Sequence, residues 1–124
     1  MDFDDIVRDQ KGLIIEETVT SLKDFTERGM VFVEDETHGK TRLYTKRTWF
    51  GTPMRLIVPI PQGKKSVIVH THIGNTLFSW EDVANLQERN IEWVCVSSVV
   101  NGKIVLRGIK VSSLGNRFVP VVLA

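Results

Sequence analysis

The chain is poor in cysteine and carries almost no net charge. Its 124 residues include a single cysteine, Cys95, which excludes an internal disulfide and a zinc site built from paired cysteines. Cys95 lies inside the apolar run Ile91–Val96, so we expect a small buried hydrophobe and not a nucleophile. The 16 lysines and arginines almost balance the 15 acidic residues, which gives a formal net charge of +1. Such a chain has no overall field to attract nucleic acid.

One short segment is locally basic. Its basic residues alternate with apolar and aromatic ones in a region where we expect a hairpin, and they are Lys40, Arg42, Lys46 and Arg47. A solvated strand face explains this pattern more simply than a nucleic-acid surface does. We therefore expect no nucleic-acid partner.

Long hydrophobic runs are also missing. No apolar stretch approaches the roughly 18 residues of a membrane span, and the first ten residues, MDFDDIVRDQ, are acidic and unlike a signal peptide. We therefore expect no membrane partner and a cytoplasmic location. The hydrophobic fraction of 42% and the charged fraction of 25% are typical of globular proteins. The length fits one compact domain over residues 1–124.

The order of local patterns predicts an α+β domain. Apolar residues at helical spacing indicate one or two amphipathic helices before Phe25, with Gly12 as a break or loose joint. A short helix is expected from Ser79 to about Arg89. The remaining patterns indicate strands at Met30–Val33, Thr41–Trp49, Met54–Ile60, Ser66–His70, Ile91–Ser97, Lys103–Val111 and Arg117–Leu123. Turns are expected at 36–40 and at 101–102. Together these patterns predict a mixed β-sheet flanked by helices.

Two histidines follow the most apolar strand at a spacing typical of metal sites. His70 and His72 are two residues apart, so in a strand both imidazoles point to one face and can reach one ion. Asp82 is the candidate third ligand. Three protein ligands of this type leave one position of a tetrahedral zinc ion open for water, as in catalytic sites. We therefore predict one bound Zn²⁺.

Ser79 and Asp82 also fit a second interpretation. Ser-x-x-Asp at the start of a helix is close to a capping box, in which each side chain bonds to the other's backbone. The serine can cap the helix and still donate its hydroxyl, but a capping Asp82 would be poorly placed to bind an ion. The preceding histidines favour the ligand role for Asp82.

The pattern His70-x-His72 followed by Ser79-x-x-Asp82 resembles the JAMM (MPN-type) zinc metalloproteases, a family that includes deubiquitinase-like isopeptidases. The family also places a glutamate before a glycine and a strand, and Glu27 in TERGMVFV is similar. The order of expected elements agrees from Glu27 to about residue 111, roughly two thirds of the chain. The resemblance implies the three-layer, cytidine-deaminase-like architecture of that family. The chain has no long insertions, and in this respect it resembles a minimal prokaryotic or viral form of the family.

The resemblance also implies a mechanism and a substrate class. His70, His72 and Asp82 would hold zinc, Glu27 would act as the general base, and Ser79 would donate to the oxyanion. The reaction would hydrolyse an amide bond, at the C-terminus of a ubiquitin-like protein or in a short peptide tail. We expect such an enzyme to act as a monomer or homodimer.

The chain departs from the family pattern at two places. Ile73 stands where the family usually has proline, and nine residues separate His72 from Asp82 where the family usually has ten. Gly74 and Asn75 allow a tight turn that still brings Asp82 to the ion.

Other residues compete for the predicted roles. Glu16 and Glu17 are expected on the solvated face of the first helix, and Glu34 in a surface turn, which leaves Glu27 as the favoured base. His38 lies beside a glycine in a turn and is not expected to be a ligand.

Two other functions are compatible with the sequence. A catalytically silent MPN-like scaffold or binding module needs the fold but not the base. Another type of zinc hydrolase is less favoured, because the paired cysteines or second histidine motif typical of such enzymes are missing.

Overall fold

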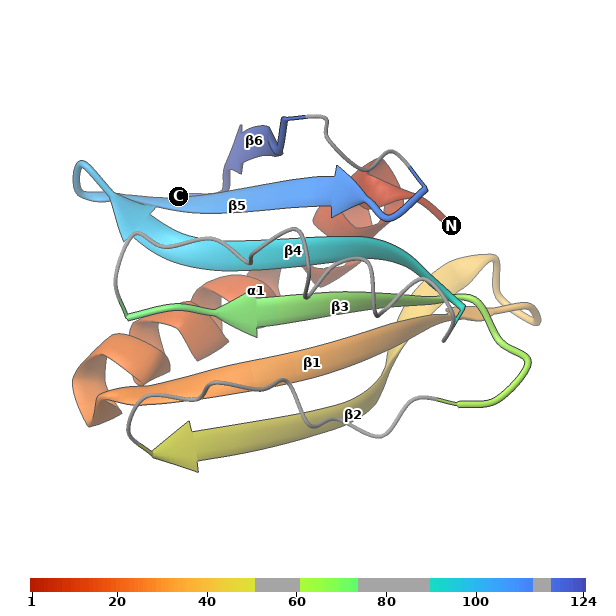
Figure 1. Cartoon of the computed structure of the whole chain (residues 1–124), viewed down its shortest axis with the longest axis horizontal. Coiled ribbons are helices and arrows are strands. Elements are labelled where there is room, and N and C mark those ends of the chain that lie inside the picture. The colour runs from red at the N-terminus through yellow and green to blue at the C-terminus, as the bar shows by residue number, and fades with distance from the viewer. Residues whose placement is uncertain (51–60, 74–89, 113–116) are drawn as a thin grey trace.

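A computed structural model of the chain shows a six-stranded mixed sheet with one long helix packed against it (Figure 1). It describes residues 1–50, 61–73, 90–112 and 117–124, with side chains through residue 48 in the first range. The strands lie side by side in the order β2-β1-β3-β4-β5-β6. Only the β3–β4 pair is parallel among these neighbours. The predicted α+β class and mixed sheet are therefore confirmed at this level.

Helix α1 runs from Phe3 to Asp24 without interruption. Asp2 and Asp5 form a capping box at its start, since each carboxylate accepts the other's backbone N–H, at 3.1 and 2.8 Å. The prediction of a break at Gly12 was wrong. Glycine in a helix costs about 1 kcal/mol, but the fully buried Ile6 and Ile14 anchor the helix on either side of it.

The predicted hairpin after the helix is confirmed. Strand β1 spans Thr26–Asp35 and pairs with antiparallel β2, Lys40–Phe50. β1 is longer than the predicted Met30–Val33, because extended backbone begins directly after the left-handed residue that ends α1. Glu27 therefore lies inside the strand and not before it.

The centre of the sheet is formed by β3, Ser66–Thr71, and β4, Ile91–Val100. Every residue of β3 is buried, as its apolar pattern predicted. β4 turns into β5, Lys103–Lys110, through Asn101 and Gly102, both with positive φ (51° and 76°) as a two-residue hairpin requires. The last strand, β6, spans Val119–Val122 and is shorter than predicted.

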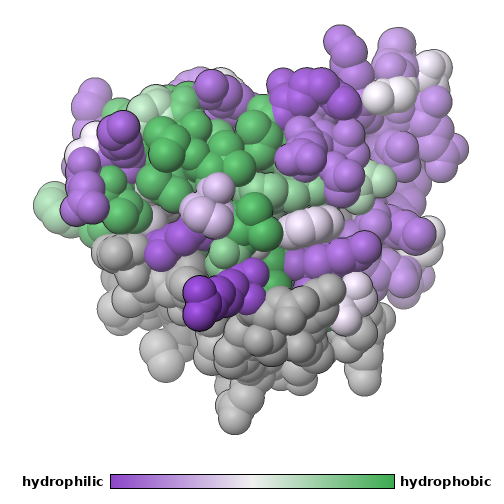
Figure 2. Space-filling model, turned by 90° about the horizontal axis from the view of Figure 1, so that it is seen from above, coloured by the Kyte–Doolittle hydropathy of each residue, from purple (hydrophilic) through white to green (hydrophobic). Residues whose placement is uncertain are grey.

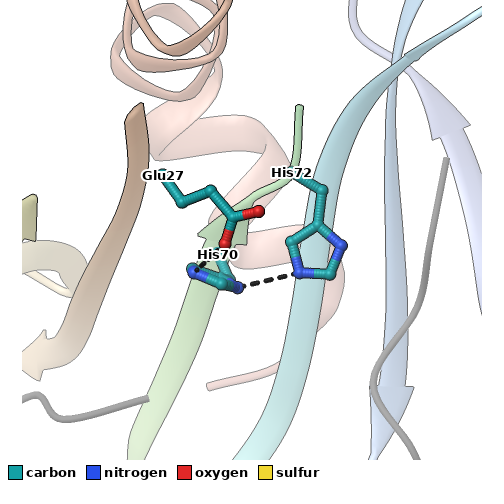
Figure 3. A group of neighbouring side chains, drawn as sticks. All are labelled: Glu27, His70 and His72. Carbon is teal, nitrogen blue, oxygen red and sulfur yellow. Dashed lines mark hydrogen bonds and ion pairs between the residues drawn. The ribbon is translucent and has the colours of Figure 1, made fainter. Parts of the chain in front are cut away.

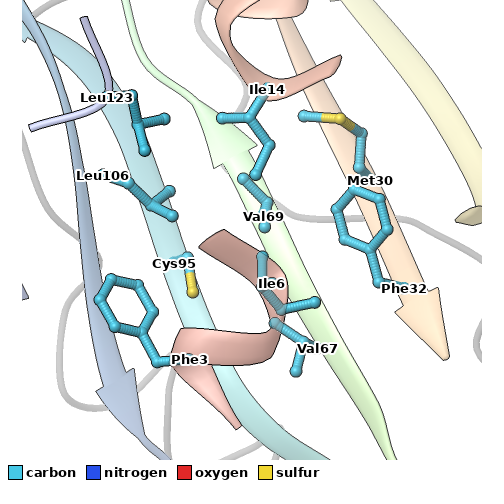
Figure 4. Packing of buried hydrophobic residues seen from close by; sticks show 10 residues of the cluster. All are labelled: Phe3, Ile6, Ile14, Met30, Phe32, Val67, Val69, Cys95, Leu106 and Leu123. Atoms are coloured by element: carbon cyan, nitrogen blue, oxygen red, sulfur yellow. The ribbon is translucent and has the colours of Figure 1, made fainter. Parts of the chain in front are cut away.

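The main core fills the space between α1 and the sheet (Figure 4). Alternate residues of the strands point to this face, where they meet the apolar side of the helix. The buried residues of this cluster are Phe3, Ile6, Ile14, Met30, Phe32, Val67, Val69, Cys95, Leu106 and Leu123. Cys95 is fully buried, as expected, and burial raises the pKa of its thiol.

The opposite face of the sheet has its own buried cluster, formed by Val31, Ile68, Ile91, Val94, Ile109 and Val111. These residues alternate along the strands with those of the main core. His70 is two residues after Ile68 in β3, so it lies on this second face, away from α1.

Two predicted elements lie outside the described residues, namely the strand at 54–60 and the helix at 79–89. In the described ranges, no helix combines the length and the apolar character that a membrane crossing requires.

β6 lies at the top of Figure 1, and Figure 2, viewed from that side, shows hydrophobic side chains gathered over part of the surface. Val119 and Val122 of this strand are 47% and 54% exposed.

Candidate metal centre

Glu27, His70 and His72 come together on the sheet face that points away from α1 (Figure 3). One ligand atom from each side chain lies within 4.8 Å of the others. Both histidines are buried, at 4% and 8% exposure, and Glu27 is half-buried. Among the described residues, this is the group of His, Cys, Asp or Glu side chains whose ligand atoms lie this close together.

Strand register explains why these side chains meet. Gly29 of β1 is paired with His70 of β3, and Glu27 precedes Gly29 by two residues, so both point to the same face. Continued past the last pair, this register places residue 27 opposite residue 72. Gly29, which is paired with His70, adds no side chain to this face.

Thr71, between the two histidines, fixes the end of β3 from the other face. Its Oγ1 lies 2.6 Å from Ser21 Oγ of α1 and accepts the backbone N–H of Arg28 at 2.9 Å. The His72 N–H donates to the carbonyl of Ser97 at 2.9 Å, which continues the pairing with β4 beyond Thr71. These bonds hold the backbone of the segment that presents both imidazoles.

An ion-pair network centred on the buried Glu17 lies on the helix side of β1 and β2. Glu17 of α1 accepts from Arg28 at 2.8 Å and from Lys46 at 2.6 Å, and Arg28 also contacts Asp24 at 3.3 Å. The prediction that Glu17 is solvated was wrong, because this face of the helix packs on strands that present two cations to it. Burial alone would raise the pKa of Glu17, but the hydrogen bonds from Lys46 and Arg28 outweigh it and lower the pKa below its usual value.

The electrostatics of the site favour neutral imidazole at His70. Burial, together with the neighbouring His72, lowers the pKa of His70 to about 3. His70 Nε2 lies 3.5 Å from Glu27 Oε2, but at neutral pH this contact joins a neutral ring to the carboxyl group and is not an ion pair. Burial also raises the pKa of Glu27. Neutral imidazole is the form that binds metal ions.

The distance between the facing nitrogens of the two histidines is close to that between two ligands of one small ion. Ligand atoms around a tetrahedral zinc lie about 3.3 Å apart, since each is about 2.0 to 2.1 Å from the metal. His72 Nε2 lies 2.9 Å from His70 Nδ1, close to this spacing, whereas the 3.5 Å contact with Glu27 is made by the other ring nitrogen of His70, Nε2. His70 can give one ion only one of these two nitrogens. Two imidazoles and a carboxylate are a donor set that zinc accepts.

The structure brings together three of the five residues predicted from the sequence. His70 and His72 share one face, as their spacing predicted, and Glu27 is beside them. Ser79 and Asp82 lie outside the described residues, so their roles as oxyanion donor and third ligand stay predictions.

The competing residues are found elsewhere. Glu16 and Glu34 are exposed, as expected, although Glu34 lies in β1 and not in a turn. His38 is exposed in the β1–β2 turn, where its Nδ1 lies 2.8 Å from Asp35 Oδ2.

Sequence reasoning missed the residues that hold the site's backbone from the opposite face of the sheet. Thr71 and Ser21 were not singled out, although a hydroxyl residue between two same-face histidines must point to the opposite, buried face. That alternation is the signal that identifies Thr71 as a buried polar group in need of a partner.

Comparisons of the chain with protein-family models, with curated proteins and with solved structures found no match. The resemblance to JAMM metalloproteases therefore rests on the motif and the order of elements alone. The geometry of Glu27, His70 and His72 is the independent basis for a functional proposal.

Proposed function

We propose that the protein is a zinc-dependent amide hydrolase of the JAMM type. The observation that supports this proposal is the group formed by the half-buried Glu27 and the buried His70 and His72, whose ligand atoms lie within 4.8 Å of one another. In this proposal, His70, His72 and Asp82 hold one zinc ion, Glu27 is the base and Ser79 is the oxyanion donor. A bound zinc ion would supply an activated water molecule and polarise the scissile carbonyl.

The two histidines are suited to hold an ion before substrate arrives. His70 is neutral at physiological pH, with its pKa lowered to about 3, so its ring nitrogen needs no deprotonation before it binds. The backbone of His72 is fixed by its bond to Ser97 and by the neighbouring Thr71. A preorganised pair of ligands places the reacting groups with little loss of conformational entropy.

Glu27 is suited to move a proton. Burial raises the pKa of its carboxyl group, which brings its basicity closer to that of a group working near neutral pH. Beside the two imidazoles, the carboxylate can take a proton from the attacking water and return it to the leaving amine. A general base of this kind contributes typically about 10²- to 10⁴-fold to the rate.

Glu27 has a second candidate role as a ligand in place of Asp82, since its oxygen is within ligand distance of both histidines. The two roles make opposite predictions for Glu27→Gln. Loss of a base leaves zinc bound, whereas loss of a charged ligand releases it.

The substrate class comes from the family resemblance. The proposed reaction cleaves an amide bond at the C-terminus of a ubiquitin-like protein or in a short peptide tail. The three-layer architecture typical of JAMM domains is part of the same proposal, and α1 with the mixed sheet is consistent with two of its layers.

The rate of amide hydrolysis, compared between the natural protein and two glutamate variants, tests the proposal. The natural protein, Glu27→Gln and Glu34→Gln would be assayed with zinc against a fluorogenic short peptide amide and a ubiquitin-like fusion. Glu34 is an exposed residue of the same strand and serves as the control. We expect Glu27→Gln to lose at least roughly 100-fold in kcat/KM with zinc retained, and Glu34→Gln to be unaffected.

Two results would contradict the proposal in different ways. Loss of zinc from Glu27→Gln would assign Glu27 as a ligand and not as the base. No cleavage of either substrate by the zinc-loaded natural protein would favour the catalytically silent scaffold.

A further inference from the structure

Arg107 of β5 shares a sheet face with the candidate metal centre. Register pairs His70 with Val96 and Val96 with Arg107, so the three residues form one row across neighbouring strands. Side chains two residues apart in a strand point to the same face, so Arg107 shares its face with Ile109. Ile109 belongs to the buried cluster on the face away from α1. Arg107 therefore points to the same side of the sheet as His70, two strands or roughly 10 Å away.

A buried serine directs the guanidinium toward the histidines. Arg107 Nη2 donates to Ser98 Oγ at 3.1 Å, and Ser98 is fully buried. Thr71 is paired with Ser97, so the next position of β4, Ser98, falls in the row of His72. The side chain of Arg107 thus reaches from the row of His70 toward the row of His72.

The charge of Arg107 is incompletely compensated by the described residues. Its Nε is buried without a hydrogen-bond partner, and no carboxylate of the described ranges forms an ion pair with it. Burial lowers the pKa of Arg107 below its usual value, although a guanidinium stays protonated at neutral pH. By contrast, Arg28 is paired with both Glu17 and Asp24. A partly desolvated cation without a counter-charge favours binding of an anion.

We propose that Arg107, positioned by Ser98, binds a carboxylate of the substrate of the Glu27, His70 and His72 site. This inference rests on the proposed hydrolase function and adds a substrate class to it. A guanidinium binds a carboxylate through two parallel hydrogen bonds, which neither lysine nor a neutral side chain can reproduce. The backbones of Arg107 and His70 are roughly 10 Å apart, and an extended residue spans roughly 3.3 Å, so this carboxylate lies within about three residues of the scissile bond.

Matched peptides test the preference in the natural protein. One pair differs by Asp against Asn three residues from the scissile bond, and a second pair by a free C-terminal carboxylate against a C-terminal amide at that distance. We expect kcat/KM to be roughly 10- to 100-fold higher for the charged member of one pair, the range of a charged hydrogen bond. The pair that shows the preference identifies the source of the carboxylate. Equal values within both pairs would overturn the inference.

Variants then assign the preference to Arg107. Arg107→Gln should bring the charged-to-neutral ratio close to 1, and Arg107→Lys should restore it only in part. Arg42→Gln removes an exposed arginine of β2 and should leave the ratio unchanged. Zinc content should be the same in all four proteins. A preference that persists in a folded Arg107→Gln would overturn the assignment.

Binding without catalysis separates this inference from the proposed function. Calorimetric titration with the same peptide pairs measures recognition even if no peptide is cleaved. Tighter binding of a charged peptide that is lost in Arg107→Gln would support the carboxylate site while the hydrolase function fails. Cleavage with equal affinity and equal kcat/KM for all peptides would keep the hydrolase function and refute the role of Arg107.

Discussion

The hydroxyls of Ser21 and Thr71 lie 2.6 Å apart, on the face of the sheet opposite to the two histidines that flank Thr71. This contact ties helix α1 to the end of β3, the strand segment from which the imidazoles project. Strand alternation thus divides one short segment into a structural face and a chemical face. Stability and metal binding are therefore testable through neighbouring residues.

Thr71→Val should destabilise the fold. Valine keeps the shape of the side chain but leaves the Arg28 N–H and the Ser21 hydroxyl without their bonds to Thr71, in a buried place. The expected loss is about 1 to 3 kcal/mol in the free energy of unfolding, measured by urea denaturation. Thr48→Val, at an exposed position of β2, is the control. Equal stability of both variants would show that the buried contact is unimportant.

Two glycine substitutions should change stability in opposite directions. A Cβ at Gly108 would lie 2.7 Å from the ring of Phe3, which itself stacks on Trp93 with ring centroids 5.4 Å apart. Gly108→Ala should therefore lose about 1 to 3 kcal/mol through overpacking. A Cβ at Gly12 meets nothing within 4 Å, so Gly12→Ala should gain about 0.5 to 1 kcal/mol. Thermal denaturation would reveal the opposite signs, and a stabilised Gly108→Ala would refute the packing.

Glu17→Gln should destabilise the protein in a way that depends on pH. The native-state pKa of Glu17 is lowered, so its contribution is present above the unfolded value of about 4.5 and is lost as the pH falls below it. At pH 7 the variant should lose about 1.5 to 3 kcal/mol, the range of a hydrogen bond to a charged group, because Arg28 and Lys46 lose their charged partner. The difference from the natural protein should shrink toward pH 3. Glu16→Gln, on the exposed side of the helix, is the control, and a loss that stays constant with pH would contradict the ion-pair explanation.

Local patterns predicted much of the fold. The hairpin β1–β2 follows from its turn and alternating strands, and the Asn101–Gly102 turn from residues that tolerate positive φ. The continuity of α1 through Gly12 was not predictable locally, because packing of Ile6 and Ile14 against the sheet overrides the low propensity of glycine.

The site was predictable where it depends on spacing within one strand. His70 and His72 share a face because a strand has a period of two, and Glu27 joins them through its position relative to Gly29 in the register. The burial of Glu17 and the bond from Arg107 to Ser98 depend on contacts between segments far apart in the chain, or on strand register. Periodicity contains no information about such partners.

Zinc content measured by elemental analysis, after dialysis against metal-free buffer, tests the central claim most directly. The natural protein and His38→Ala, which removes an exposed histidine, should each retain one zinc ion per chain, while His70→Ala and His72→Ala should retain little. Circular dichroism would check that all variants keep their fold. Absence of zinc from the natural protein after incubation with the metal, or equal zinc in all four proteins, would contradict a zinc centre at His70 and His72.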